Sequence, residues 1–251
     1  MKNKERTENR KAFPKFLGLM LGAGLVGGLI GVVAGFLSGS AAPEAMVDAI
    51  HALLAAASPW CIWIISGVLL GLGFWKYRQA KAQFSAWDGE DEETVEQAEE
   101  RLNWALGCTS LALVLDFFFA AAGMILVEEL LPWIGLLVGF VLSLGGMVAL
   151  QQKTVDLIKQ MNPEKRGSVY DMNFQKKWMA SCDENELRQI GQASFKAFNA
   201  VNYTCAFSWT VLVLLHRSFN VGILPVFLVT LIWGVSQMAY TLESIRLGRH
   251  R

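Results

Sequence analysis

The sequence has few of the residues from which catalytic and metal sites are usually built. Only 3 of its 251 residues are histidines and only 4 are cysteines. The cysteines lie far apart and form no Cys-x-x-Cys pair, so we expect neither a disulfide framework nor a zinc site. Gly-x-Ser-x-Gly and Walker A motifs are absent, as are paired aspartates within an apolar stretch. These absences predict a protein that is not an enzyme and that holds no cofactor and no metal.

Charged residues are scarce too, at 18% of the chain, against about 25% in ordinary soluble domains. The 22 basic and 22 acidic residues cancel, so no basic excess suggests a nucleic acid partner. Six long stretches carry almost no charge, and each is long enough as a helix to cross the roughly 30 Å hydrocarbon core of a bilayer. The predicted transmembrane helices lie at about 16–38, 58–76, 104–127, 132–152, 199–216 and 221–242.

The distribution of lysine and arginine predicts how these spans are oriented. All but one of the 22 basic residues lie in the two terminal tails and in or beside two connections, at about 77–103 and 153–198; the exception is Arg217. By the positive-inside rule these segments and both termini are cytoplasmic. The predicted fold class is all-α: a single polytopic membrane domain, 1–251, of six transmembrane helices arranged as three hairpins, N-in and C-in, with helical cytoplasmic connections.

Proline and glycine predict details of helix ends and helix packing. Pro59, Pro132 and Pro225 are each expected in the first turn of a descending helix, where the missing N–H costs nothing. The link at about 39–58 is expected to hold a short helix on the outer surface. Three glycines share one face of the first span, so a second helix, from this chain or from another copy, can approach it closely. These helix-packing residues are Gly27, Gly31 and Gly35.

The connection at about 153–198 is the largest segment expected in water. It should continue the fourth span as a helix, break at Asn162-Pro163, and begin its last helix at Asp183, with Glu186 completing a capping box. Four large apolar side chains should either pack on one another or enter the headgroup layer with two lysines over anionic lipid. These residues are Phe174, Trp178, Phe195 and Phe198, and the lysines are Lys176 and Lys177. A docking surface for a cytoplasmic partner is the alternative.

Part of this connection resembles a known family. The run NPEKRGSVYD at 162–171, followed by Phe174, Lys177-Trp178 and 181–184, is similar to an uncharacterised family of membrane proteins of Gram-positive bacteria, catalogued as domain of unknown function 3169. The likeness extends over nearly the whole chain. It implies a bacterial plasma membrane and brings no activity, cofactor or catalytic residue. The candidate cytoplasmic interaction site consists of Asn162, Pro163, Lys165, Arg166, Tyr170, Asp171, Lys177 and Trp178.

Asp116 is the only ionisable residue deep inside a predicted span. A carboxyl group near the bilayer midplane is costly, so such a residue is a functional hypothesis by default. Three residues at similar depth could hydrogen-bond to it and complete a candidate intramembrane polar site: Ser208, Trp209 and Thr230. The carboxyl group either fixes helix packing or carries a proton or cation. A relay needs several polar groups along a path, and Ser143, Ser236 and Gln237 make a thin one.

Two classes of function follow. The first is a non-enzymatic membrane regulator or accessory protein whose 153–198 segment binds a cytoplasmic or membrane protein. The alternative is a small proton- or ion-coupled transporter or channel that uses Asp116. Immunity against membrane-active peptides is a third possibility that the sequence does not separate from the first. A water-filled cavity that reaches Asp116 would favour transport, and a dry helix bundle would favour the regulator.

Overall fold

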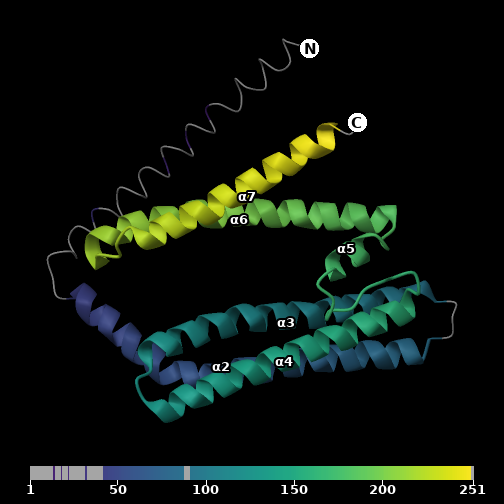
Figure 1. Ribbon diagram of the computed structural model, residues 1–251, viewed down its shortest axis with the longest axis horizontal. Helices are drawn as coiled ribbons and strands as arrows, with labels where there is room; N and C mark the ends of the chain where they lie inside the picture. The colour runs from purple at the N-terminus through teal and green to yellow at the C-terminus, as the bar shows by residue number, and fades with distance from the viewer. Residues whose placement is uncertain are drawn as a thin grey trace. The chain divides into compact units, whose positions relative to one another are not determined.

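In the computed structural model of the chain, placement is described for residues 14, 18, 22, 32, 42–87 and 91–249. This part of the chain is built from helices and connecting segments and contains no strand (Figure 1). The helices are α2 (Ala42–Ser85), α3 (Glu92–Leu126), α4 (Leu130–Met161), α5 (Phe174–Met179), α6 (Glu184–Phe219) and α7 (Leu224–Arg249). The predicted first span at about 16–38 lies outside the described residues except for isolated positions, and so do Gly27, Gly31 and Gly35.

Five of these helices, α2, α3, α4, α6 and α7, are long and apolar enough to cross a membrane. The all-helical, membrane-type fold is thereby confirmed. The sixth span, the three-hairpin arrangement and the N-in, C-in orientation remain predictions. The chain divides into two compact units, Ala49–Gln189 and Met1–Asp48 with Ile190–Arg251.

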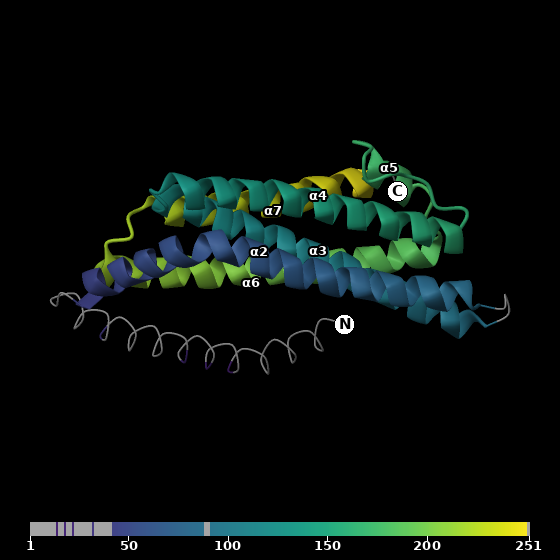
Figure 2. The same cartoon turned by 90° about the horizontal axis from the view of Figure 1, so that it is seen from below.

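In the unit Ala49–Gln189, helices α2, α3 and α4 run side by side in both views (Figures 1 and 2). Three residues, Val127–Glu129, join α3 to α4. Two apolar clusters hold the three helices together, and glycines let them approach closely. A Cβ atom on Gly73 would lie 3.3 Å from the carbonyl oxygen of Ala105, and one on Gly139 would lie 2.9 Å from the ring of Trp63. One cluster consists of Ala80, Ala98, Leu102 and Leu157. The other consists of Ile62, Ala120 and Leu136.

The prediction that Pro59 opens a helix is wrong, because this proline lies inside α2. The segment expected as a separate surface helix is, in its described part, the continuous beginning of α2. Proline removes one backbone hydrogen bond from the helix. The alanines before it favour helix strongly enough for the helix to tolerate this loss. The hydroxyl of Ser58 also donates to the carbonyl of Leu54, at 2.6 Å. Pro132 and Pro225 do lie in the first turns of α4 and α7, as expected.

The predicted helix boundaries in the 153–198 connection are confirmed. Helix α4 ends at Met161, directly before Asn162-Pro163. At the start of α6, Asp183 and Glu186 form the predicted capping box: each backbone N–H donates to the other's carboxylate, at 2.8 Å in both cases. Asp91 caps α3 in a related way, since its carboxylate accepts from the backbone N–H of Glu93 at 3.0 Å.

In the other unit, α6 from Ile190 onward pairs with α7 through polar and aromatic contacts. The side-chain oxygen of Asn202 accepts hydrogen bonds from the indole of Trp233 and the amide of Gln237, both at 3.1 Å. Phe198 stacks on Tyr240 with ring centroids 4.6 Å apart, so this phenylalanine packs on α7. The turn between the helices contains Gly222 with a φ of 78°, which glycine adopts without strain.

Candidate interaction site

The chain reverses direction after α4 and folds back over the end of that helix. The reversal begins where the backbone N–H of Lys165 donates to the carbonyl of Asn162, at 3.0 Å. The side-chain amide of Asn162 donates to the carboxylate of Glu99 on α3, at 2.6 Å. Gly167 has a φ of 132°, and a Cβ atom there would lie 2.8 Å from the ring of Phe174. Only glycine fits this position without strain.

Hydrogen bonds from α4 hold the returning segment in place. The side-chain oxygen of Gln152 accepts from the hydroxyl of Ser168 at 3.0 Å and from the backbone N–H of Val169 at 2.8 Å. The ammonium group of Lys159 donates to the carbonyl of Gly167, at 3.1 Å. The polar connection is therefore a folded structure on the end of α4 and not a loose linker.

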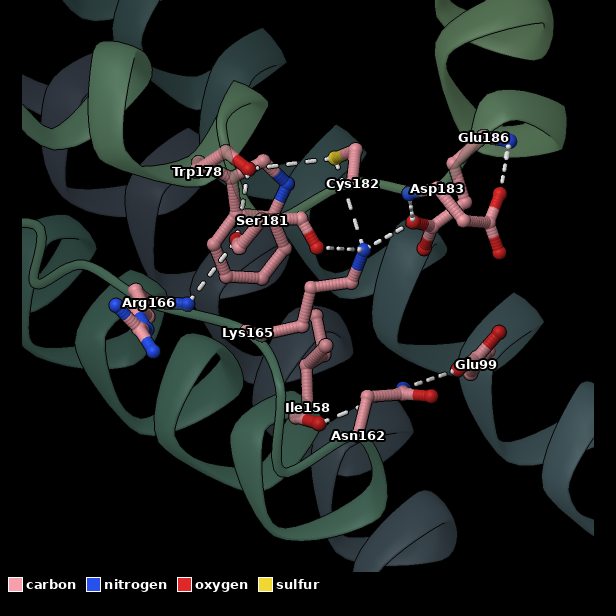
Figure 3. Close-up of polar contacts among 10 residues, drawn as sticks. All are labelled: Glu99, Ile158, Asn162, Lys165, Arg166, Trp178, Ser181, Cys182, Asp183 and Glu186. Atoms are coloured by element: carbon pink, nitrogen blue, oxygen red, sulfur yellow. Dashed lines mark hydrogen bonds and ion pairs between the residues drawn. The ribbon is translucent and has the colours of Figure 1, made fainter.

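Lys165 is the buried centre of this folded segment (Figure 3). Its side chain is 2% exposed and forms an ion pair with Glu186. The ammonium group also lies 3.6 Å from the sulfur of Cys182 and 5.8 Å from the ring centroid of Trp178. A buried charge is tolerated when it is paired and hydrogen-bonded in this way. Burial lowers the pKa of Lys165, but Glu186 and then Cys182 more than offset that effect, and the pKa is raised above its usual range.

Short helix α5 and the residues after it build the wall around Lys165. Phe174 packs on Trp178 with ring centroids 5.5 Å apart. The carbonyl of Trp178 accepts hydrogen bonds from the hydroxyl of Ser181 at 2.8 Å and from the thiol of Cys182 at 3.4 Å. The backbone N–H of Arg166 donates to the hydroxyl of Ser181 at 3.1 Å, which joins the two sides of the segment (Figure 3).

A cleft of about 780 Å³ opens beside the Lys165–Glu186 pair. This volume is within the range of about 300–1,000 Å³ that is usual for ligand pockets. Lys177 on its rim forms an ion pair with Asp171, and this lysine, together with the backbone N–H of Asn173, lowers the pKa of Asp171 below its usual range. Arg166 is exposed and forms no ion pair with a described residue. The lining residues are Glu164, Arg166, Lys177, Ala180, Ser181, Cys182, Asp183 and Glu186.

A second polar cluster lies inside the three-helix unit around Asp116. This residue is 0% exposed, and its carboxyl group meets Ser66 of α2 and Ser143 of α4. The hydroxyl of Ser66 lies 2.8 Å from each carboxyl oxygen, and the two hydroxyls are 2.9 Å apart. The cluster therefore ties all three helices together through one closed set of hydrogen bonds.

Comparison with protein families gives the wider setting. The family model described as "Protein of unknown function (DUF3169)" matches residues 10–244. The chain belongs to the DUF3169 family. No curated protein and no solved structure matches it.

The structure of this DUF3169 protein sorts the predicted interaction residues into two kinds. Lys165 and Trp178 form the interior of the folded segment, and Asn162 fastens it to α3. Arg166 and Lys177 line the cleft. The remaining three predicted residues belong to neither group, and of these Asp171 is the ion-pair partner of Lys177. These three are Pro163, Tyr170 and Asp171.

Some residues of the cleft and of the Asp116 cluster were not among the predicted ones. Glu186 was predicted as a helix cap and is also the partner of Lys165. The family-like run at 181–184 was the signal that could have pointed to Ser181 and Cys182 as cleft residues. Ser66 on α2 was not predicted as a hydrogen-bond partner of Asp116. Ser208, Trp209 and Thr230 lie in the other unit of the DUF3169 chain, so their contact with Asp116 stays a prediction.

Proposed function

We propose that this DUF3169 protein is a non-enzymatic regulator or accessory protein of the bacterial plasma membrane. It binds a cytoplasmic or membrane protein partner through its 153–198 segment. The observation that supports this proposal is the fixed cleft beside Lys165 and Glu186, with charged side chains of both signs on its rim. The positive-inside rule puts this segment on the cytoplasmic side.

The chemistry of the cleft suits a polypeptide partner. Arg166 and Glu164 present opposite charges to solvent on a segment whose backbone is held by hydrogen bonds. Paired charges across an interface give specificity and orientation. A preorganised surface also avoids the entropic cost of ordering a loop when the partner binds.

The buried carboxyl group supports a packing role for Asp116 rather than transport. Asp116 is enclosed by two serines and has no exposed surface. Further along the bundle, the hydroxyls of Ser58 and Thr109 donate to carbonyls of their own helices. Among the residues that the structure describes, the side chains of Ser66, Asp116 and Ser143 hydrogen-bond only to one another, so no chain of hydrogen bonds leads from Asp116 to either end of the bundle. An enclosed carboxyl group of this kind favours the regulator.

The proposed function can be tested by photocrosslinking in native membranes. A photoreactive amino acid at Ala180, which lines the cleft, should form an adduct with a second protein. The same probe at Tyr170, which is 70% exposed and outside the cleft, is the control for random collisions. Arg166→Glu should abolish the adduct from position 180. Lys176→Glu makes the same charge change outside the cleft on the same segment and should leave the adduct intact.

Two results would count against the proposal. Adducts of equal yield from positions 170 and 180 would mean that the cleft has no selective partner. Equal loss with Arg166→Glu and Lys176→Glu would mean that overall charge, and not the cleft, governs the association.

A further inference from the structure

Two lysines near one end of the three-helix unit carry charges that no described residue neutralises. Lys153 on α4 and Lys76 on α2 form no ion pair within the described part of the chain. Each ammonium group instead lies over an aromatic ring: Lys153 is 5.9 Å from the ring centroid of Phe74, and Lys76 is 5.3 Å from that of Trp75. Aromatic rings with lysines beside them are typical of the level where a helix leaves the hydrocarbon core.

Lys153 also borders a groove. The groove lies between α2 and α4, has a volume of about 170 Å³, and has Lys153 as the one charged residue of its lining. The other lining residues are Leu70, Phe74, Gly146, Ala149 and Leu150. Counted along α4, these residues extend from Lys153 toward the uncharged part of the helix. The groove is therefore apolar along its length and positive at one end.

We propose that this groove binds an anionic phospholipid, with an acyl chain along the apolar wall and the phosphate at Lys153. The polarity of the groove matches that of a lipid placed with its headgroup at the membrane surface. The unpaired ammonium group favours a lipid of net negative charge over a zwitterionic one, whose own amine already balances the phosphate. Basic grooves between transmembrane helices are known to hold anionic headgroups.

The site can be tested with the purified full-length chain by native mass spectrometry. The chain is equilibrated with equal amounts of phosphatidylglycerol and phosphatidylcholine, and the retained lipids are counted. The wild type should retain phosphatidylglycerol in preference. Lys153→Gln should lower that preference about fivefold, since one lysine near an anionic headgroup contributes on the order of 1 kcal/mol. Lys76→Gln is the matched control, because Lys76 lies over an aromatic ring but outside the groove, and it should change little.

A second variant probes the apolar wall without changing charge. Ala149 is exposed in the groove, so Ala149→Leu should fold normally and displace the acyl chain, which lowers retention of the lipid. No preference in the wild type, or equal losses with Lys153→Gln and Lys76→Gln, would overturn the proposal. If Lys153→Gln does not fold, unchanged lipid retention in Ala149→Leu refutes the site. A second protein chain in place of lipid in the mass spectrum would also refute it.

Discussion

For the ion pair of Lys165 and Glu186, we predict that substitutions of the two residues differ in their cost to stability. Glu186→Gln removes the negative charge, but the amide oxygen can still accept from the backbone N–H of Asp183. It leaves the ammonium group of Lys165 buried without its counter-charge. Lys165→Met instead replaces the buried charge with an apolar side chain of similar size. We therefore expect the two substitutions to differ greatly in cost although both break the same ion pair.

The magnitudes follow from the exposure of the two side chains. Lys165 is 2% exposed and Glu186 is 36% exposed. Leaving a fully buried charge unpaired costs about 3–5 kcal/mol, and replacing a whole buried ion pair with packed apolar residues is often neutral. Because Glu186 is partly hydrated, we expect about 2–3 kcal/mol for Glu186→Gln and less than about 1 kcal/mol for Lys165→Met.

Hydrogen–deuterium exchange of the detergent-solubilised protein measures this local opening. The reporter amides are those of Arg166, bonded to Ser181 at 3.1 Å, and Ala180, bonded to the carbonyl of Lys176 at 3.1 Å. Glu186→Gln should speed their exchange about 30- to 150-fold. Lys165→Met should change it less than about fivefold.

A matched variant controls for the loss of an ion pair as such. Lys177→Met breaks the ion pair between Lys177 and Asp171. Because the side chain of Lys177 is 55% exposed, this substitution should change the hydrogen exchange of the reporter amides only slightly. Equal acceleration by Glu186→Gln and Lys165→Met would refute the reasoning, because it would mean that the attraction itself, and not the unpaired buried charge, sets the cost.

Three further predictions concern single residues and pH. Asp116→Ala should lower the free energy of unfolding by about 1–3 kcal/mol, because it leaves two buried serine hydroxyls without their acceptor. Asp116→Asn should lower it by less than half as much. Chemical unfolding in detergent measures both variants, and equal losses would contradict the packing role. Gly167→Ala should cost about 1–3 kcal/mol, since its φ of 132° is strained for alanine and the new Cβ atom meets Phe174; unchanged proteolysis of the segment would count against this. The pKa of Lys165 is raised in the folded state, so the pair's contribution should be complete below the ordinary value of 10.5 and disappear as the pH rises through the folded pKa. Exchange protection of Arg166 that falls between pH 6 and 9 would contradict that assignment.

The positions of the helices could be predicted from the sequence because each depends on local patterns. Uncharged runs predicted α3, α4, α6 and α7, and the Asp183–Glu186 spacing predicted the start of α6. Pro59 was misjudged because the proline rule considers one position, whereas the alanines before it favour a continuous helix.

The contacts that make the two polar sites could not be predicted in the same way. The run that includes Lys165 marked the right segment, but a lysine in a polar connection is normally exposed, and its burial depends on α5 folding over it. Likewise Asp116 was recognised as unusual, but its hydrogen bond with Ser66 depends on the register in which α2 packs along α3. Register of this kind is fixed by tertiary packing and has no signature in either helix alone.

Adduct formation from position 180 in cells that carry Glu186→Gln or Lys165→Met would show most directly whether the folded cleft is what a partner protein binds. We predict that Glu186→Gln, which opens the segment, abolishes the adduct, and that Lys165→Met, which keeps it closed, preserves it. An adduct that survives Glu186→Gln at full yield, while the amide of Arg166 exchanges freely, would show that the partner does not need the cleft.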